Sequence, residues 1–462
     1  MDSLTQITLG AAVGEATLGR KVGNKAMLWG AIAGTIPDLD VLASPFISDV
    51  QRLVFHRSFT HSILFAVLFA PVLGKLIARV HANAGADWRG WSWLSFWGLF
   101  THPLLDSLTI WGTQLFWPFS NYRVAVNSVF VADPLYTLPF LFFLIAAMFF
   151  KRSSKMRWRL NTAGLVISTA YLLTGLVIKT HVNTAFERSL QRQGISFSRY
   201  FTNPTPLNIV LWIGVAESEE GFWQGYYSIF DKNRDISFRF IPKNHHLISG
   251  NGHPEIEKLK WVSKGFFAIT EKQGRLLFND LRFTQSDTEL HSPRHFLFAY
   301  ELPEPTPHAG MISGVRKVAA DFNVNGSVLK SFWQRIKGID GMRRQDYLQL
   351  WLNAWHLPAA PMLSQAFLPG AELVDRTWQH AVPADSATSY LARWRRVYPD
   401  HMRLVQRPMP GDRDFTLVRW HLRTSEQPQH PAAVTGVDSV FFSGEKIRKL
   451  VIQHSVYAPG TQ

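Results

Sequence analysis

The 462-residue sequence contains no cysteine. Disulfide bonds and thiolate metal sites are therefore excluded, and any metal ion has to be held by nitrogen and oxygen ligands. The first 25 residues also lack the pattern of a cleaved signal peptide, because Arg20, Lys21 and Lys25 follow the apolar stretch instead of preceding it. We expect no cleaved targeting segment.

Charged residues are scarce, at 18% of the chain. Six apolar stretches in the first part are long enough, or nearly so, to cross a bilayer, which takes about 20 residues in a helix. They comprise residues 4–18, 26–36, 63–80, 91–108, 131–150 and 160–178. In the two shortest, glycines recur four residues apart, a spacing that lets membrane helices pack closely. We therefore predict an all-α polytopic membrane domain over residues 1–182, in which Glu15 pairs with Arg20 or Lys21.

The net charge of +14 is distributed unevenly between the two ends of these predicted helices. Eleven Lys and Arg side chains lie in or beside three turns, 19–25, 79–90 and 151–159, whereas the opposite loops, 38–60 and 109–130, hold three. Cytoplasmic loops are enriched in basic residues, so we expect the three turns in the cytoplasm and the rest of the chain outside it. Because membrane flanks account for most of the charge, no specific nucleic-acid partner is indicated.

Histidine and aspartate side chains gather where the apolar segments end. They are Asp38, Asp40, His56, His61, His102 and Asp106. Hydrocarbon tolerates such groups only where they are paired or bound, and the charge distribution puts all of them at the same, outer membrane face. Neutral imidazole suits zinc, and carboxylate oxygens suit hard or borderline cations. The sequence therefore predicts a site for a divalent metal ion, with zinc as the first choice.

Each of these candidates also has a structural alternative. His102 and Asp106 lie at i and i+4, so in a helix they share one face and can bind one ion or only pair with each other. Asp38 and Asp40 need a turn to converge, and one of them can instead cap a helix or support a ligand. Arg57 can hold a phosphate or another anion, or remain solvated at the membrane interface.

Four motifs follow one another along the first part of the chain. They are residues 1–5 (MDSLT), 34–40 (GTIPDLD), 56–62 (HRSFTHS) and 102–106 (HPLLD). Together they resemble the YdjM/YbcI family of bacterial inner-membrane proteins, regarded as metal-dependent hydrolases, and the resemblance covers about residues 1–190. The family is distantly similar to zinc-dependent phospholipase C and related single-strand nucleases. The resemblance implies that the six His and Asp residues above are metal ligands and that the substrate is a phosphoester. Gln6 departs from the pattern, since some relatives have histidine there.

After Lys179 the composition becomes that of a soluble protein. Six short runs rich in aromatic and β-branched residues, separated by turn residues, predict an antiparallel sheet. They are residues 209–214, 226–231, 236–241, 266–270, 274–283 and 295–302. We therefore expect a β-rich domain over residues 183–310, of which 303–310 is a proline-rich linker.

The last part of the chain combines helices and strands. The predicted helices are 345–357 and 385–398, and the predicted strands lie near 402–407, 415–424, 434–442 and 446–457. With the stretch 371–376, this order resembles a SnoaL-like domain of the nuclear-transport-factor-2-like superfamily, which implies an α+β cone over residues 335–462. The candidates to line its pocket are Asp375, Trp378 and His421. Core or rim roles are favoured for all three.

The sequence therefore predicts a multidomain protein in which a polytopic domain of the bacterial inner membrane carries a β-rich domain and an α+β domain in the periplasm. The predicted function is metal-dependent hydrolysis of a phosphoester or lipid-like substrate at the outer membrane face. Asp40 is expected to accept the proton of a metal-bound water, and Arg57 to stabilise charge on the substrate. The expected partners are the lipid bilayer and a phospholipid-like substrate, and no oligomeric state is indicated. The alternative is a non-catalytic assembly or sensor protein in which a metal clamps the helix ends.

Overall fold

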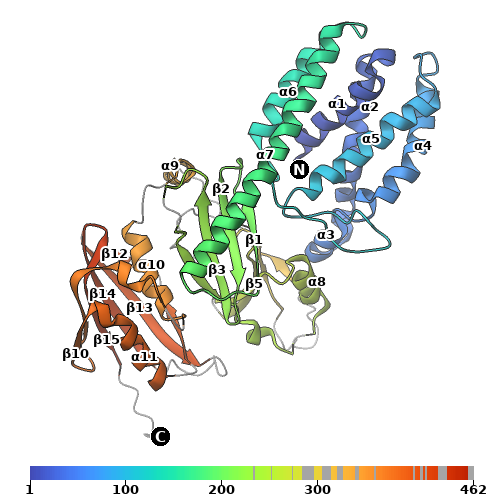
Figure 1. The fold of residues 1–462 in the computed structure, drawn as a ribbon. Coiled ribbons are helices and arrows are strands. Elements are labelled where there is room, and N and C mark those ends of the chain that lie inside the picture. Colours follow the sequence, from blue (N-terminus) through green and yellow to red (C-terminus); the bar gives the residue numbers. More distant parts are fainter. Residues whose placement is uncertain are drawn as a thin grey trace.

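The structure is a computed structural model of the whole chain, in which a helical bundle, a β-rich part and a C-terminal α+β part follow one another (Figure 1). It describes residues 1–232, 235–250, 252–272, 274–283, 296–303, 314–319, 326–338, 343–357, 360–398, 401–405, 409–410, 414–424 and 434–455. The predicted succession of helical, β-rich and α+β regions is confirmed.

The helical bundle contains all six predicted apolar segments. Its elements are α1 (Ser3–Val22), α2 (Asn24–Thr35), α3 (Asp49–Phe55), α4 (Ile63–Val80), α5 (Trp88–Ser107), α6 (Pro134–Met148) and α7 (Lys155–Arg192), with the 3-10 helices η1 (Ile36–Phe46) and η2 (Phe59–His61). Within the described residues, Asn24–Phe46, Ile63–Val80 and Lys155–Arg192 are long and apolar enough to cross a membrane, and α6 is a shorter apolar helix. Six of the helices begin at a side chain that accepts a backbone N–H of the first turn, which satisfies one of the free donors there. These N-caps are Asp2, Ser48, Ser62, Asp87, Asp133 and Ser154.

Helices α1 and α2 pack against each other through glycine. A Cβ atom built on Gly30 of α2 would lie 2.2 Å from the Gly10 carbonyl oxygen and 2.8 Å from the Gly14 Cα atom of α1. Such contacts form only between backbones without side chains, as the glycine spacing predicted. Because α2 leads directly into η1, this contact also helps to fix the position of Asp38.

Replacing Gly30 by valine is therefore expected to destabilise the bundle by more than about 3 kcal/mol, because a side chain would have to be accommodated where two helix backbones touch. Thermal unfolding of the purified full chain in detergent measures the effect. The matched control is Ile32→Val on the same helix, since the Ile32 side chain is 37% exposed. Equal melting temperatures for the two variants would contradict the close packing.

The buried carboxylate of Glu15 pairs with Arg157, so the predicted pairing with Arg20 or Lys21 is wrong. Glu15 Oε1 and Oε2 accept hydrogen bonds of 2.6 Å from Nε and Nη2 of Arg157 on α7. Arg20 and Lys21 follow Glu15 by five and six positions, which places them on other faces of α1, and both are exposed. The true partner lies on a helix that is remote in sequence, so the pattern of α1 alone could not identify it.

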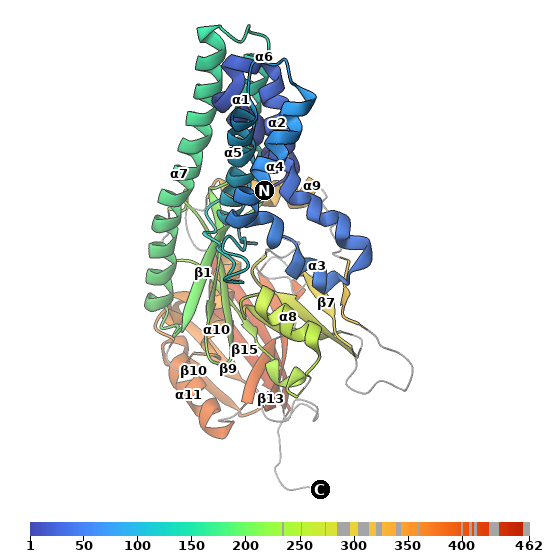
Figure 2. The same cartoon turned by 90° about the vertical axis from the view of Figure 1, so that its right-hand side faces the viewer.

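Helix α7 is far longer than the predicted apolar segment. With 38 residues it spans about 57 Å, and it continues past position 178 to Arg192. Its second half leaves the bundle and runs along the first sheet (Figure 1 and Figure 2), where Val182, Phe186 and Leu190 are buried against strand residues. These apolar residues recur every four positions, a helical signal in a segment of otherwise polar composition. The expected domain boundary at 182–183 therefore lies inside a helix.

The β-rich part contains two antiparallel sheets, where the sequence predicted one. The first has the strand order β1-β2-β3-β4, and the second β5-β6-β7-β8. The elements are β1 (Arg199–Pro204), β2 (Leu211–Glu217), β3 (Gly221–Ser228), β4 (Phe238–Pro242), η3 (His245–Ile248), α8 (Pro254–Val262), β5 (Phe267–Lys272), β6 (Arg275–Asp280), β7 (Ala299–Glu301), β8 (Arg316–Lys317) and α9 (Gly326–Ile336). Residue patterns mark strands but do not say which sheet each one joins. All but the first residue of the predicted linker 303–310 lies outside the described residues.

The C-terminal part has a seven-stranded sheet whose core is shared with two helices. The strand order is β10-β9-β15-β14-β13-β11, with β12 paired to β13. Among the described strands, β9 and β15 pair in parallel and the other pairs are antiparallel. The elements are α10 (Arg344–Ala354), η4 (Leu363–Ala366), β9 (Phe367–Asp375), β10 (His380–Pro383), η5 (Ala384–Ser386), α11 (Ala387–Val397), β11 (His401–Val405), β12 (Met409–Pro410), β13 (Phe415–Thr424), β14 (Val434–Ser443) and β15 (Lys446–His454). Within the described residues, the predicted helices and strands of this region are confirmed, and positions 406–407 and 456–457 of the predicted strands lie outside those residues.

The loop side of the bundle contacts the second sheet and α8. Helix α3 lies beside α8 in both views (Figure 1 and Figure 2), and Ser48 Oγ donates a 2.5 Å hydrogen bond to Glu255 Oε1. The ring of Trp111 packs 4.6 Å from the ring of Phe283 and 5.1 Å from that of Phe298. The end of the bundle that carries the predicted metal site therefore faces the β-rich part.

Candidate metal centre

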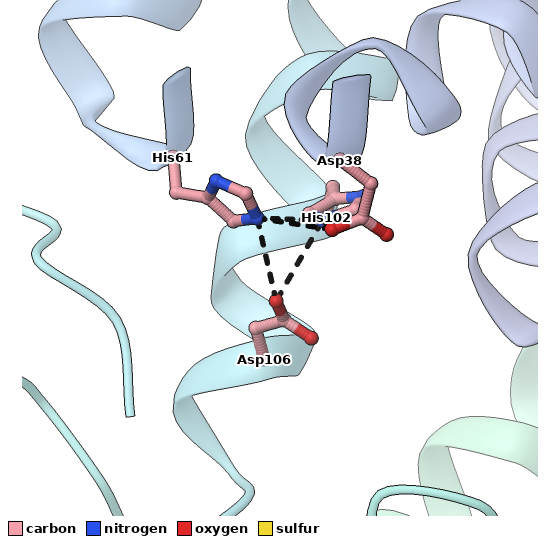
Figure 3. A group of neighbouring side chains, drawn as sticks. All are labelled: Asp38, His61, His102 and Asp106. Carbon is pink, nitrogen blue, oxygen red and sulfur yellow. Dashed lines mark hydrogen bonds and ion pairs between the residues drawn. The ribbon is translucent and has the colours of Figure 1, made fainter. Parts of the chain in front are cut away.

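Four of the predicted residues converge at one point of the bundle (Figure 3). Asp38 comes from η1, His61 from η2, and His102 and Asp106 from successive turns of α5. His61 Nε2 lies 3.2 Å from His102 Nε2 and 3.3 Å from Asp38 Oδ1. His102 Nε2 lies 3.5 Å from Asp38 Oδ1, and Asp106 Oδ2 lies 3.6 Å from both imidazole nitrogens. The i, i+4 spacing thus places both α5 residues on the face turned toward η1 and η2.

Hydrogen bonds at the other ring nitrogens orient both imidazoles. His102 Nδ1 donates to the Gly34 carbonyl oxygen at 2.6 Å, and His61 Nδ1 lies 3.1 Å from Thr60 Oγ1 and 3.5 Å from Asp40 Oδ2. With the proton on Nδ1, each ring presents a lone pair at Nε2. Burial lowers the pKa of His61 to about 4, so this ring is neutral near pH 7. Two lone pairs that face each other are best accommodated with a cation between them.

The separations within this group suit tetrahedral coordination. A zinc ion with bonds of about 2.0–2.2 Å places its ligand atoms about 3.3–3.6 Å apart, and the five separations given above range from 3.2 to 3.6 Å. Octahedral coordination with bonds of about 2.1 Å would bring neighbouring ligands to about 3.0 Å. Asp106 Oδ2 is buried and receives no hydrogen bond from the described residues. The group can hold a metal ion through two nitrogen and two oxygen atoms.

Asp40 and His56 lie on the opposite side of His61 from this point. Asp40 Oδ1 is 2.8 Å from His56 Nδ1, and Asp40 Oδ2 accepts hydrogen bonds from the Arg57 amide at 3.1 Å and from Thr60 Oγ1 at 3.3 Å. Asp40, His56 and His61 form a second group of possible ligands that shares His61 with the first. The six predicted residues are therefore all gathered at one end of the bundle, but two of them stand apart from the four converging atoms.

Asp40→Asn is expected to weaken metal binding by about 10- to 100-fold, because the carboxylate orients His61 and the loop that carries it. Competition with a chelator measures the affinity of the purified protein for zinc. Asp49→Asn is the matched control, since the Asp49 side chain is 40% exposed and pairs only loosely, at 3.7 Å, with Arg52. A variant at position 40 that binds zinc as tightly as the control would rule out this supporting role.

Arg57 is buried beside the cluster, with 4% of its surface exposed. Its Nε lies 3.0 Å from Asp106 Oδ2, and Nη1 donates to Thr109 Oγ1 at 3.0 Å. Its φ of +65° is rare for a residue with a side chain and costs on the order of 1 kcal/mol. The contacts with Asp106 and Thr109 stabilise this strained conformation. Because Arg57 is buried, it does not occupy the solvated position at the membrane interface that was the alternative.

Gln6 belongs to the surroundings of the cluster and was not predicted as a contributor. Gln6 Nε2 donates to Asp106 Oδ1 at 3.1 Å and to the His102 carbonyl oxygen at 3.3 Å. The Met1 amino group also pairs with Asp106. The signal available in the sequence was an amide side chain within an apolar segment that is long enough to enter a membrane.

In the C-terminal part, Asp375 is committed to internal hydrogen bonds. Its carboxylate accepts from the Tyr390 hydroxyl at 2.7 Å and from the Trp378 amide at 3.0 Å, and it lies 3.2 Å from His454 Nε2. Burial alone would raise the pKa of Asp375, but these hydrogen bonds outweigh it and lower the pKa. This arrangement agrees with the core role favoured for Asp375, whereas His421 lies partly exposed on β13.

Asp375→Asn is expected to destabilise the protein near neutral pH, and the difference from the wild type is expected to shrink in acid. The unfolded carboxyl has a pKa of about 3.9, and the folded value is lower. The unfolded state therefore binds the proton first, so the stabilisation is present above about pH 4 and is lost as the pH falls through the folded pKa. Chemical unfolding at about pH 7 and about pH 3 tests this, with the exposed Asp385→Asn as control. A constant difference at both pH values would contradict the assignment.

Known proteins resemble the first part of the chain in sequence. Residues 1–182 match the family model of the YdjM inner membrane protein. The matched residues include all six predicted ligands and Arg57. Inner membrane protein YbcI of Escherichia coli (strain K12) is 38% identical over 109 residues, which are 23% of this chain and 61% of YbcI. The uncharacterized protein YfhP of Bacillus subtilis (strain 168) is 31% identical over 141 residues, 29% of this chain and 42% of YfhP. The chain thus spans less than two thirds of either relative, and the YdjM match and the apolar helices together support a membrane location.

Solved structures resemble the C-terminal region. A protein of the SnoaL-like family from Agrobacterium tumefaciens (strain C58) is 19% identical and covers 24% of this chain and 97% of its own, with a TM-score of 0.21. A hypothetical protein with a ketosteroid isomerase-like fold from Catenulispora acidiphila is 15% identical and covers 24% of this chain and 84% of its own, with a TM-score of 0.20.

Proposed function

We propose that the protein is a membrane-bound, metal-dependent hydrolase that acts on a phosphoester or lipid-like substrate at the outer face of the inner membrane. The observation that carries the proposal is the convergence of Nε2 of His61 and His102 with carboxylate oxygens of Asp38 and Asp106. Zinc is the proposed ion, because this donor set and its tetrahedral separations suit zinc better than an octahedral cation. The phosphoester class of the substrate follows from the motif resemblance.

The residues of the cluster would each have a separate role beside a metal-bound water, whose pKa the ion would lower. Asp38 is the proposed proton acceptor, because its side chain is 20% exposed and can meet solvent while Oδ1 faces the ion. Asp40 was expected in this role, but its side chain is 2% exposed and already accepts hydrogen bonds from the loop. We assign Asp40 to the orientation of His61. Arg57 would hold the anionic part of the substrate beside Asp106.

The same geometry also favours the second candidate, a structural metal site in a non-catalytic assembly or sensor protein. Four protein ligands at the corners of a tetrahedron close a zinc site, whereas catalytic zinc keeps a position for water or substrate. The partial exposure of Asp38 supports the hydrolase, because this ligand is the one that a substrate could reach.

Metal analysis followed by a phosphoester assay decides between the two candidates. The full chain is purified in detergent, its metal content is measured, and hydrolysis of soluble and lipid phosphodiesters is followed before and after chelation and zinc replacement. Hydrolysis that is lost with the metal and restored by zinc supports the enzyme. Stoichiometric metal without hydrolysis of any phosphoester supports the structural site, and protein without metal under zinc-replete conditions contradicts both.

A further inference from the structure

Four basic side chains meet where the bundle contacts the β-rich part. Arg57 precedes η2, Arg123 lies in the loop between α5 and α6, Lys264 follows α8, and Arg282 follows β6. Lys264 Nζ donates to the Arg123 carbonyl oxygen at 3.2 Å, so residues 141 positions apart are in direct contact. The group adjoins the metal cluster, because Arg57 Nε lies 3.0 Å from Asp106 Oδ2.

Arg123 is a buried cation without a carboxylate in hydrogen-bonding contact among the described residues. Only 5% of its surface is exposed. Its Nη2 donates to the carbonyl oxygens of Leu53, Val54 and His56 at the end of α3, at 2.5, 3.1 and 2.9 Å. Its Nε has no acceptor within the part of the chain that the structure describes. The guanidinium lies 5.3 Å from the ring centre of Trp261 on α8, so it is shielded from water on that side.

Arg282 is buried to a similar degree, at 3% exposed. One side of its guanidinium group pairs with a carboxylate. Nε and Nη2 donate to the Asp280 carboxylate at 3.0 and 2.6 Å. Nη1, in contrast, has no acceptor among the described residues. The rings of Trp111 and Phe283 flank the guanidinium, with centres 5.8 and 5.4 Å away.

The four cations raise one another's electrostatic energy. Burial, together with the charges of Arg282 and Arg57, lowers the pKa of Arg123 to about 9. Burial, with the charges of Arg282 and Arg123, lowers the pKa of Lys264 to about 8. Asp106 and Asp280 offset part of the positive charge through Arg57 and Arg282, but no carboxylate contacts Arg123 or Lys264 in the described residues. Buried charge of one sign is costly unless a counter-charge is bound.

We propose that Arg57, Arg123, Lys264 and Arg282 form a binding site for a phosphate group at the junction between the bundle and the β-rich part. Guanidinium groups match phosphate oxygens in charge and in geometry, and Nε of Arg123 and Nη1 of Arg282 have no acceptor within the described part of the chain. A carboxylate ligand would need fewer cations. The assignment of this phosphate to the substrate of the metal centre rests on the proposed function. The site would then hold a phosphate of the substrate while a neighbouring ester lies at the metal.

Binding of phosphate to the metal-stripped full chain in dodecyl maltoside tests the site, because chelation removes the other place where phosphate could bind. Isothermal titration uses two ligands, inorganic phosphate and dihexanoyl phosphatidylglycerol below its micelle concentration. We expect Lys264→Gln and Arg123→Gln each to weaken binding by about tenfold, as the loss of one charge-assisted hydrogen bond does. Lys264→Gln is the milder variant, since the Lys264 side chain makes a single hydrogen bond within the part of the chain that the structure describes.

Lys260→Gln is the matched control, because this lysine of α8 pairs with Glu257 away from the cluster. Weaker binding of both ligands in the two cluster variants, with the control unchanged, supports a site for the phosphate group itself. An effect on the lipid alone assigns the site to a headgroup, and an effect on inorganic phosphate alone assigns it to free phosphate. Absence of binding to the metal-stripped wild type, or equal binding by all variants, overturns the site. If phosphate binds here and the protein hydrolyses no phosphoester, the site stands and the proposed function fails.

Discussion

Replacing His102 by alanine is expected to remove the bound metal and to lower phosphoester hydrolysis by about a thousandfold or more. The His102 ring is fixed by its hydrogen bond to the Gly34 carbonyl oxygen and supplies one of the two converging Nε2 atoms. Without it, the carboxylates of Asp38 and Asp106 face each other with a single imidazole between them. Elemental analysis of the purified variant gives the metal content, and the phosphoester assay gives the activity.

His81→Ala is the matched control for this experiment. His81 follows α4 and packs against the rings of Trp29 and Trp91, outside the metal cluster. Both variants are expected to insert into the membrane like the wild type, because insertion depends on the apolar helices and not on a single histidine near a helix end. Unchanged metal content in the His102 variant would eliminate the site as proposed.

The second prediction with a large expected effect concerns the side of the membrane on which each part of the chain lies. Its readout is whether a cysteine at a given position is labelled or not. Since the chain has no cysteine, single cysteines at Ser249 in the β-rich part and at Ser153 between α6 and α7 report their location without background. Both serines are exposed, and the Ser249 hydroxyl makes a long hydrogen bond of 3.4 Å to the His245 carbonyl oxygen. The positive-inside bias predicts that a membrane-impermeant thiol reagent labels intact cells at position 249 and not at position 153.

Permeabilised cells provide the control, because both positions should then react. The reverse labelling pattern in intact cells would place the metal cluster and the β-rich part in the cytoplasm. It would also remove the outer membrane face from the proposed function while leaving the metal chemistry open.

The convergence of the metal cluster was predictable because its residues interrupt apolar segments at their ends, where polar groups need a partner. The division of roles among them was not. Asp38 and Asp40 are two positions apart, and only the tight turns of η1 direct Asp38 to the Nε2 side of His61 and Asp40 to its Nδ1 side. A spacing of two residues is compatible with either arrangement, so this distinction requires coordinates.

Other features escaped prediction because they depend on contacts between remote segments. The partner of Glu15 is Arg157, 142 positions away, and composition along α1 says nothing about it. The basic cluster at the junction draws Arg123 and Arg282 from two different parts of the fold. Neither residue belongs to a motif in its own stretch of sequence, and their shared burial becomes visible only in the structure.

The continuous helix α7 connects the helical bundle directly to the first sheet. No loop interrupts this helix between the bundle and the segment that lies along strands β1 to β4. The side chains of Val182, Phe186 and Leu190 pack its far half against that sheet. A rod about 57 Å long that tilts by about 3° moves its end by about 3 Å. A change in bilayer thickness or lateral pressure that tilts α7 would therefore displace the first sheet, to which the far half of this helix is packed.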